Sequence, residues 1–222
     1  MEPTSNCSSA SGGALFVGAA AIMQAIESEN LILYQTDLRG QWPQGAARAF
    51  AARLPYARRL ALRPGSAAAR ASLAGIALAL HALARLLGRR VHPGEMLFAQ
   101  GAKPRLAPPA ALDFSISHAG PWVACAALAR GRVGFDLEIG GDERIAAWVL
   151  REALLKASGE GLRALQEVQD VGVHEGRACW RGESWHVRRL AGFEGASACV
   201  VCSREVPALE SGALALAELF VT

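Results

Sequence analysis

Apolar positions at helical spacing fall in three segments of the chain. Residues 67–87 consist largely of Ala and Leu and are apolar almost all round, which predicts a long, buried helix. Residues 143–158 have helical spacing, and Asp142 stands before them as an N-cap. Residues 46–62 form a basic region with helical character that Pro55 interrupts. The sequence therefore predicts two principal helices and a broken basic one.

Shorter β-branched and aromatic runs predict strands between and after these helices. Residues 114–117, 122–129 and 133–138 have this composition, and a turn at residues 130–131 suggests that the last two pair as a hairpin. Residues 14–27 have helical character, and the apolar tail 206–222 is expected to pack against the body. Further strands are expected at residues 31–34, 91–99, 171–180, 184–189 and 197–203, with a turn or bulge at residues 93–94.

Composition indicates a folded protein. Of the 222 residues, 52% are hydrophobic and 19% are charged, which excludes a disordered chain as a whole. Residues 1–13 are rich in Ser, Gly and Thr and are expected to be disordered. The apolar run at 14–23 is too short to span a bilayer and lacks preceding basic residues, so a cytoplasmic protein that does not bind membranes is expected.

The net charge of +3 conceals a strongly basic block. Residues 39–105 contain twelve Lys or Arg and a single acid, Glu95. Such a block attracts anions. Nucleic acid is one candidate, but this block has few aromatic residues and no nucleic-acid-binding motif. A nucleotide cofactor and an acidic protein partner fit it better.

The five cysteines do not indicate a disulfide framework or a metal site. Cys199 and Cys202 form a Cys-x-x-Cys pair, but they lie in an apolar, strand-like run without a second pair or a His cluster. We expect reduced thiols.

Three carboxylates and a lysine form the candidate chemistry. Alternation along 133–138 places Asp136 and Glu138 on one face, about 7 Å apart. Glu152 and Lys156 lie one helical turn apart on a single stripe. Converging carboxylates repel one another unless a cation lies among them, and an oxygen-only set suits Mg²⁺ better than Zn²⁺. The alternative is that the Glu/Lys pair belongs to a solvated helix face.

Three ordered motifs resemble those of a known family. They are Phe-Ser-x-Ser-His at 114–118, Val-Gly-x-Asp-x-Glu at 133–138, and Trp-x-x-Arg-Glu-Ala-x-x-Lys-x-x-Gly-x-Gly-Leu at 148–162. This set resembles the 4′-phosphopantetheinyl transferases of the monomeric, two-lobed kind. A Gly-Ala-Lys-Pro run at 101–104 is similar to the family's Gly-Lys-Pro, and the resemblance covers roughly residues 50–205.

The resemblance implies an α+β fold made of a pseudo-two-fold pair of similar lobes. Each lobe would be a small antiparallel sheet packed on a long helix, with the active site between the lobes. The expected divisions are a disordered N-terminus at 1–13, an N-terminal lobe at 14–112 and a C-terminal lobe at 113–222. A monomer is expected.

The resemblance also implies the reaction: transfer of the 4′-phosphopantetheine arm of coenzyme A to a serine of an acyl or peptidyl carrier protein, with release of 3′,5′-ADP. Mg²⁺, or alternatively Mn²⁺, would be bound by Asp136, Glu138 and Glu152. Glu152 would act as the base, and Lys156 would contact phosphate and assist the leaving group. The residues implied to bind coenzyme A are Arg70, Lys103, Ser117, His118 and Lys156.

One departure from the family pattern leaves a second interpretation open. Only nine residues, 139–147, separate Glu138 from Trp148, whereas similar transferases carry a few dozen there that help to receive the carrier protein. The alternative is therefore a coenzyme A or carrier-protein binding module with impaired transfer. A nucleic-acid binder that uses residues 39–105 is the third interpretation.

Overall fold

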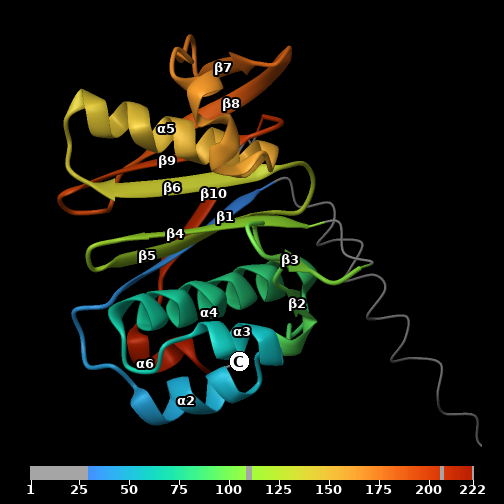
Figure 1. The fold of residues 1–222 in the computed structure, drawn as a ribbon, viewed down its shortest axis with the longest axis vertical. Coiled ribbons are helices and arrows are strands. Elements are labelled where there is room, and N and C mark those ends of the chain that lie inside the picture. The colour runs from blue at the N-terminus through green and yellow to red at the C-terminus, as the bar shows by residue number, and fades with distance from the viewer. Residues whose placement is uncertain (1–29, 109–111, 206–207, 222) are drawn as a thin grey trace, which may run out of the picture.

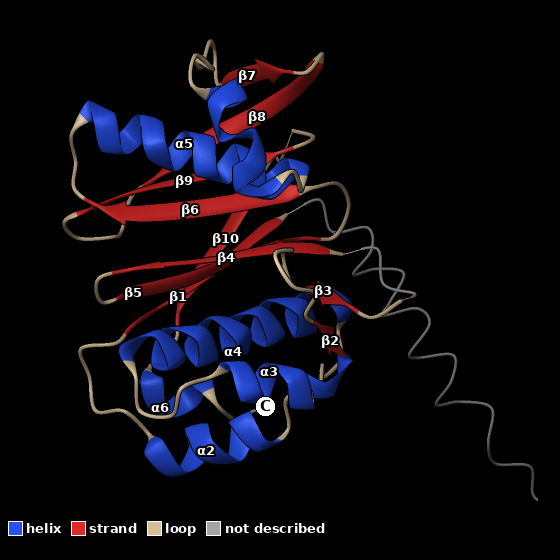
Figure 2. Ribbon diagram, in the orientation of Figure 1, coloured by secondary structure: helices blue, strands red, loops and turns tan. Residues whose placement is uncertain are grey.

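Two four-stranded sheets lie face to face, with a long helix on the outer side of each (Figure 1). The computed structural model describes residues 30–108, 112–205 and 208–221. Figure 2 shows the order of layers as helix, sheet, sheet, helix. The α+β class predicted from the sequence is confirmed. The predictions for residues 1–13 and 14–27 lie outside the described residues.

The first sheet has the strand order β10-β1-β5-β4. Strand β10 (Leu209–Ala213) runs parallel to β1 (Leu31–Asp37), so this sheet is mixed and not wholly antiparallel as expected. Strands β5 (Trp122–Leu128) and β4 (Asp113–Ala119) complete it in antiparallel pairing. The prediction that the tail packs back is confirmed by β10 and by helix α6 (Leu216–Leu219).

Helix α4 (Ala67–Leu87) covers the outer face of the first sheet, with the bounds that the sequence predicts. Ser66 caps it by accepting a hydrogen bond from the Ala69 amide. Gly75 permits close packing, because a Cβ there would lie 2.4 Å from Ile116 Cγ2. The helix is long and apolar enough to cross a membrane by length and composition alone, but 67% of that window is buried inside the protein.

Two short helices lie beneath α4 and account for the predicted basic region. Helix α2 (Gln44–Ala52) ends before Pro55, and α3 (Tyr56–Ala61) begins immediately after that proline. Proline has no amide hydrogen to donate and is favoured just before or within the first turn of a helix, so Pro55 separates the two helices as predicted.

The second sheet has the order β6-β9-β8-β7 and is antiparallel throughout. Helix α5 (Glu143–Ser158) packs on its outer face, and the Asp142 side chain caps this helix as predicted. A 3₁₀ segment, η2 (Gly161–Val168), follows. The strands are β6 (Val133–Ile139), β7 (Arg177–Trp180), β8 (Glu183–Leu190) and β9 (Ala196–Cys202).

The predicted hairpin between 122–129 and 133–138 is wrong. Strand β5 pairs with β1 and β4, whereas β6 pairs with β9. The turn after β5 therefore carries the chain from one sheet to the other. The chain passes from the first sheet to the second between Leu128 and Val133 and returns to the first sheet at β10, and the lobe boundary expected between residues 112 and 113 stays a prediction.

Two other expected strands are shorter than predicted. Within 91–99, Pro93–Glu95 is a 3₁₀ turn (η1), and β2 (Met96–Leu97) pairs with β3 (Arg105–Leu106). Proline cannot donate to a strand ladder, which favours the turn, and the turn predicted at residues 93–94 is confirmed. Residues 171–176 precede β7, because a tight turn with positive φ at Glu175 and Gly176 interrupts the strand.

The Cys-x-x-Cys pair lies on β9 with its two side chains on opposite faces. Cys199 packs in the core under α5, and Cys202 packs in the core between the sheets. Side chains three positions apart on a strand point in opposite directions, so these thiols cannot form a disulfide. Both are free and buried, and burial raises the pKa of each to about 12. The prediction of reduced thiols is confirmed for these two residues.

Candidate active site between the two sheets

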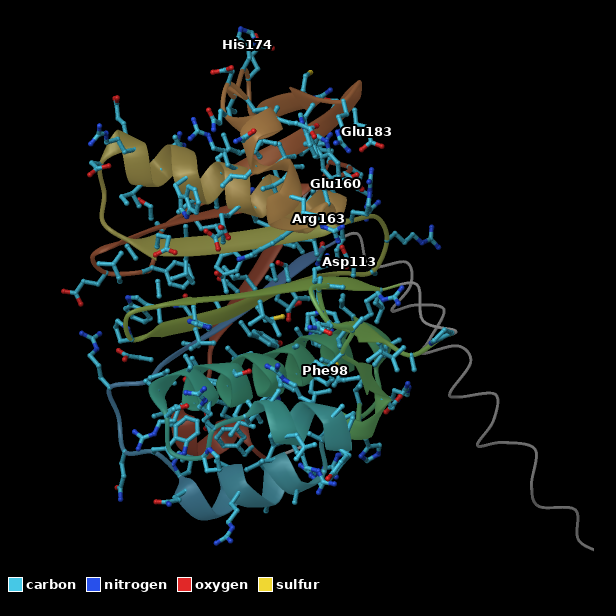
Figure 3. The ribbon with its side chains drawn as sticks, in the orientation of Figure 1. Phe98, Asp113, Glu160, Arg163, His174 and Glu183 are labelled. Carbon is cyan, nitrogen blue, oxygen red and sulfur yellow. The ribbon has the colours of Figure 1, made fainter. Side chains whose placement is uncertain are left out.

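Strands β4 and β6 lie side by side where the two sheets meet (Figure 1). They belong to different sheets, and side chains connect them: Ser115 Oγ on β4 donates to the Phe135 carbonyl on β6 at 3.3 Å. Asp113, labelled in Figure 3, lies at the start of β4, level with the junction of the two sheets. Two of the three sequence motifs are therefore brought together at this junction.

A glycine on β6 permits α5 to approach closely. A Cβ at Gly134 would lie 1.8 Å from the Ala153 carbonyl oxygen, so no larger residue fits there without displacing the helix. Asp136 and Glu138 follow at two-residue intervals and share the face of β6 that α5 covers. The close approach thus brings the third motif, on α5, to the same carboxylates.

Asp136, Ser117 and Lys156 form one hydrogen-bonded cluster. Lys156 Nζ lies 2.5 Å from Asp136 Oδ1 and 3.1 Å from Ser117 Oγ. Ser117 Oγ donates to the same Asp136 oxygen at 2.6 Å. Glu152 Oε2 lies 3.8 Å from Lys156 Nζ. Strands β4 and β6 and helix α5 each contribute to this cluster.

Asp136 is buried, and only one of its two carboxylate oxygens has hydrogen-bond partners. Its side chain is 3% exposed, and its Oδ2 atom has no hydrogen-bond partner. A buried carboxylate oxygen without a partner carries a desolvation penalty, so Oδ2 is an available ligand atom. Lys156 compensates the charge through the other oxygen.

Glu152 lies in an unfavourable environment for a negative charge. Burial raises its pKa above the usual glutamate range, and repulsion from Asp136 and Glu138 raises it further. Lys156 lowers it by a smaller effect than that of burial. The charges of Asp136 and Glu138 thus act on Glu152, and the assignment of these three carboxylates as metal ligands stays a prediction.

The donor chemistry of the cluster suits a divalent cation, although the carboxylates are not assembled around one. Among the described residues, no group of three or more His, Cys, Asp or Glu side chains is close enough to hold an ion as it stands. Lys156 occupies the position between Asp136 and Glu152. The unpartnered Asp136 oxygen and the raised pKa of Glu152 are both relieved by a cation with oxygen ligands.

His118 lies on the opposite face of β4 from Ser117. The side chains of Phe114 and Ile116 pack towards α4, and His118 follows the same alternation. It lines a cavity of about 640 Å³ together with Arg39, Arg70 and residues from the start of α4. The structure therefore separates His118 and Ser117, although it brings His118 and Arg70 together as neighbours of one cavity.

Lys103 is apart from the Asp136 cluster. Its Nζ lies 2.7 Å from Asp113 Oδ2 and donates to the Val133 carbonyl at 2.9 Å. Val133 is three residues before Asp136 on β6, which is about 10 Å along a strand. Burial lowers the pKa of Lys103, and Asp113 opposes that shift. Lys103 joins the loop before β4 to the start of β6.

Two residues near the predicted site, Arg39 and Asp113, were not predicted from the sequence. Arg39 lines the cavity with Arg70 and His118, and its place in the basic block right after β1 was the available signal. Asp113 accepts from Lys103 and from the Val133 amide at 2.7 Å, so it links the two sheets. A single Asp before a strand gives no such signal in the sequence.

Comparisons with known proteins do not extend this description. No family model matches the sequence, and a search of curated proteins gives no significant match.

Proposed function

We propose that the protein transfers the 4′-phosphopantetheine arm of coenzyme A to a serine of an apo carrier protein. The observation that carries this proposal is the cluster of Asp136, Ser117, Lys156 and Glu152 at the junction of the sheets. It combines a ligand atom for a cation, a candidate base and a candidate phosphate-binding lysine. The three ordered motifs that resemble the phosphopantetheinyl transferases supply these same residues.

The proposed step forms one bond and breaks one. The carrier serine Oγ bonds to the phosphorus that bears the pantetheine, and the pyrophosphate P–O bond to 3′,5′-ADP breaks. The serine proton passes to Glu152, and the electron pair of the broken bond remains on 3′,5′-ADP. The Lys156 ammonium stabilises the charge that develops on the leaving oxygen.

The environment of Glu152 supports its role as the base. In the metal-free protein, burial raises the pKa of Glu152, so its carboxylate accepts a proton more readily than an ordinary glutamate does. A bound cation would lower that pKa again, so the proposal that Glu152 is the base rests on its position beside Lys156 in the cluster.

Mg²⁺, or Mn²⁺, is the proposed metal, with Asp136, Glu138 and Glu152 as its ligands. When bound, it would neutralise charge on the pyrophosphate. The unpartnered Asp136 Oδ2 supports this ligand set. Lys156 would then exchange its contact with Asp136 for one with phosphate.

Coenzyme A is proposed to bind in the cavity lined by Arg39, Arg70 and His118, on the face of β4 opposite Ser117, and to extend past the edge of β4 to the cluster. Guanidinium groups suit phosphate oxygens, and His118 adds a further donor. Ser117 and Lys156 would contact the phosphates from the other face of β4. Lys103 stays a proposed ligand of coenzyme A, and its ammonium group would exchange its contacts with Asp113 and the Val133 carbonyl for one with the ligand.

The arrangement of the strands supports a pseudo-two-fold pair of lobes. The sequence strand, long helix, strand, strand occurs as β1-α4-β4-β5 and again as β6-α5-β8-β9. The pairing orders β1-β5-β4 and β6-β9-β8 correspond in the same way. This repetition is expected of the transferase fold, and the cluster lies at the junction of its halves.

One observation favours the second candidate, a coenzyme A or carrier-protein binding module. Strand β6 ends at Ile139 and α5 begins at Glu143, so residues 140–142 alone connect them. No helix stands between β6 and α5 to receive a carrier. A protein of this shape could retain coenzyme A binding and transfer slowly.

Intact-protein mass spectrometry distinguishes the two candidates. Several apo acyl and peptidyl carrier proteins are incubated with the protein, coenzyme A and Mg²⁺, with EDTA in a parallel reaction. Gain of one phosphopantetheine that EDTA prevents is the expected result. Coenzyme A binding without mass gain on any carrier would reject transfer in favour of the binding module.

A further inference from the structure

A second cavity lies between helices α2, α3 and the first turns of α4. Its volume is about 440 Å³, within the range of roughly 300–1,000 Å³ typical of small-molecule pockets. Ala47, Ala51, Leu62 and Leu73 contribute carbon surface to its wall. The cavity is thus mainly apolar and opens on the basic side of the molecule.

The charged side chains at this cavity all have the same sign. Arg48, Arg59 and Arg70 line it, and no Asp or Glu does. Within the described residues, none of these three arginines forms an ion pair with a carboxylate. Indeed, the chain contains no acidic residue between Asp37 and Glu95. Arg59 contacts the Ala52 carbonyl at 3.4 Å and Arg70 lies over the Trp42 ring, but neither contact neutralises the charge. The cavity therefore combines positive charge that no carboxylate balances with an apolar wall.

This chemistry restricts the ligand. The side-chain polar groups are the three guanidinium groups, the Trp42 indole and the Gln44 amide, and the amide alone provides a side-chain acceptor. A nucleobase, which carries several donors and acceptors on its edges, would leave donors unsatisfied. A hydrocarbon chain with one anionic, acceptor-only head group satisfies both the wall and the arginines.

We propose that this cavity is a binding site for a free fatty carboxylate of medium chain length. The carboxylate pairs with Arg48 and Arg59, and the hydrocarbon chain packs against α2 and α4. Gly65 and Arg70 line both this cavity and the one beside His118. Because Arg70 borders both cavities, the two anionic ligands would compete for its charge, and only the identification of the second ligand as coenzyme A rests on the proposed function.

Isothermal titration calorimetry with decanoate below its micellar concentration tests the site, without coenzyme A or carrier protein. Decanoate should bind one to one, and decanol, which has the same chain without the charge, should bind at least tenfold more weakly. From hexanoate upwards, each methylene that is buried should tighten binding by roughly fourfold until the cavity is full. Equal binding of decanol and decanoate, or no binding of decanoate, would overturn the proposal.

Matched variants locate the site. Arg48→Gln and Arg59→Gln should each weaken decanoate binding by about tenfold, as expected for loss of a charge-assisted hydrogen bond. Arg63→Gln removes the same charge from an exposed position outside the cavity and should leave binding unchanged. If Arg63→Gln weakens binding as much as Arg48→Gln does, general surface charge is responsible and the site is refuted.

Filling the cavity provides a test that is independent of charge. Ala51→Phe should abolish decanoate binding while the thermal unfolding midpoint and the far-ultraviolet circular dichroism are retained. Retained binding in a folded variant would refute the location. Sedimentation with phosphatidylglycerol vesicles separates the two sources of an anionic lipid: binding to vesicles but not to monomeric decanoate would replace the proposal with a membrane surface.

The coupling is measured by titrating coenzyme A with and without saturating decanoate. Each ligand should lower the binding affinity of the other by the same factor, because linkage is reciprocal. If coenzyme A does not bind at all, the proposed function fails while the decanoate titrations still decide the fatty-acid site. Independent binding of the two ligands would refute the shared use of Arg70.

Discussion

Asp136 is a buried carboxylate of which one oxygen has no hydrogen-bond partner. Its side chain is almost fully buried, Oδ1 accepts from both Ser117 and Lys156, and Oδ2 accepts from nothing. A hydrophobic residue of similar size would avoid the penalty of a buried, partly satisfied charge. The carboxylate is therefore better explained by ligand binding than by stability.

Replacing Asp136 tests this interpretation at one atom. Asp136→Asn keeps the shape and can still contact Ser117, but it removes the charge and the anionic ligand atom. Phosphopantetheine transfer should fall by about 100-fold or more, as when a group that stabilises transition-state charge is lost. Initial rates on an apo carrier protein, followed by mass spectrometry, measure the effect.

Asp142→Asn is the matched control for that variant. It makes the same chemical change three residues beyond β6, and asparagine remains a good N-cap for α5. Its transfer rate and unfolding free energy should stay close to those of the unmodified protein. Full activity in Asp136→Asn would remove Asp136 from the site.

Glu152 predicts a pH dependence of stability. Its pKa is raised in the folded state. At a pH between the unfolded-state and folded-state pKa values, the folded protein therefore holds a proton that the unfolded chain has released. The stability from this group is present below the usual glutamate pKa and is lost as pH rises through the folded pKa. Glu152→Gln never ionises, so its free energy of unfolding should rise relative to that of the unmodified protein as the pH increases from 4 to 7.

Urea unfolding without divalent ions at both pH values measures that difference. Adding Mg²⁺ at pH 7 should stabilise the unmodified protein more than the variant, because a bound cation favours the ionised Glu152. A difference that stays constant from pH 4 to pH 7 would contradict the raised pKa.

At the scale of elements, the packing of α5 on β6 depends on one missing side chain. A Cβ at Gly134 would overlap the Ala153 carbonyl, and backbone cannot move as freely as a side-chain end. Because α5 carries Glu152 and Lys156, the same contact fixes the distance between the helix residues and Asp136. Stability and site geometry are thus linked at this position.

Gly134→Ala should lower the unfolding free energy by about 3 kcal/mol, at the upper end of the usual cost of overpacking. Transfer should fall as well, because Glu152 and Lys156 would be displaced from β6. Gly141→Ala is the control, since a Cβ there meets nothing within 4 Å. Equal urea midpoints for the two variants would show that α5 does not lie as close to β6 as described.

The sequence predicted individual elements better than their pairing. Helices α4 and α5 have their predicted bounds, because a serine and an aspartate cap them and glycines end them. The hairpin between β5 and β6 was wrong, because a short turn between two apolar strands looks the same whether the strands pair or belong to facing sheets. Partners of β1 and β6 lie far away along the chain.

For the whole molecule, the two sheets share one core. Leu33 and Ala126 of the first sheet and Phe135 and Val200 of the second belong to the same buried cluster. Neither sheet can expose its inner face without exposing the other. The protein should therefore unfold as one cooperative unit despite its repeated strand arrangement.

Phe135→Ala tests this shared core. The substitution should lower the free energy of unfolding by about 3–5 kcal/mol. Backbone amides of β5 and β9 should lose the same amount of protection from hydrogen exchange, although these strands lie in different sheets. Leu60→Ala, at a side chain that is 69% exposed on α3, should change stability by less than about 0.5 kcal/mol. Loss of amide protection in β9 alone would show that the two sheets unfold separately.

The sequence by itself determined the elements and the donor groups of this protein. Helical periodicity and caps act within a few residues, and the spacing of Asp136, Glu138, Glu152 and Lys156 follows from one strand and one helix. The tertiary structure decided what each group faces. It brought Ser117 to Asp136, placed His118 at the same cavity as Arg70, and paired Lys103 with Asp113, because these positions join separate elements and depend on how the sheets and helices pack.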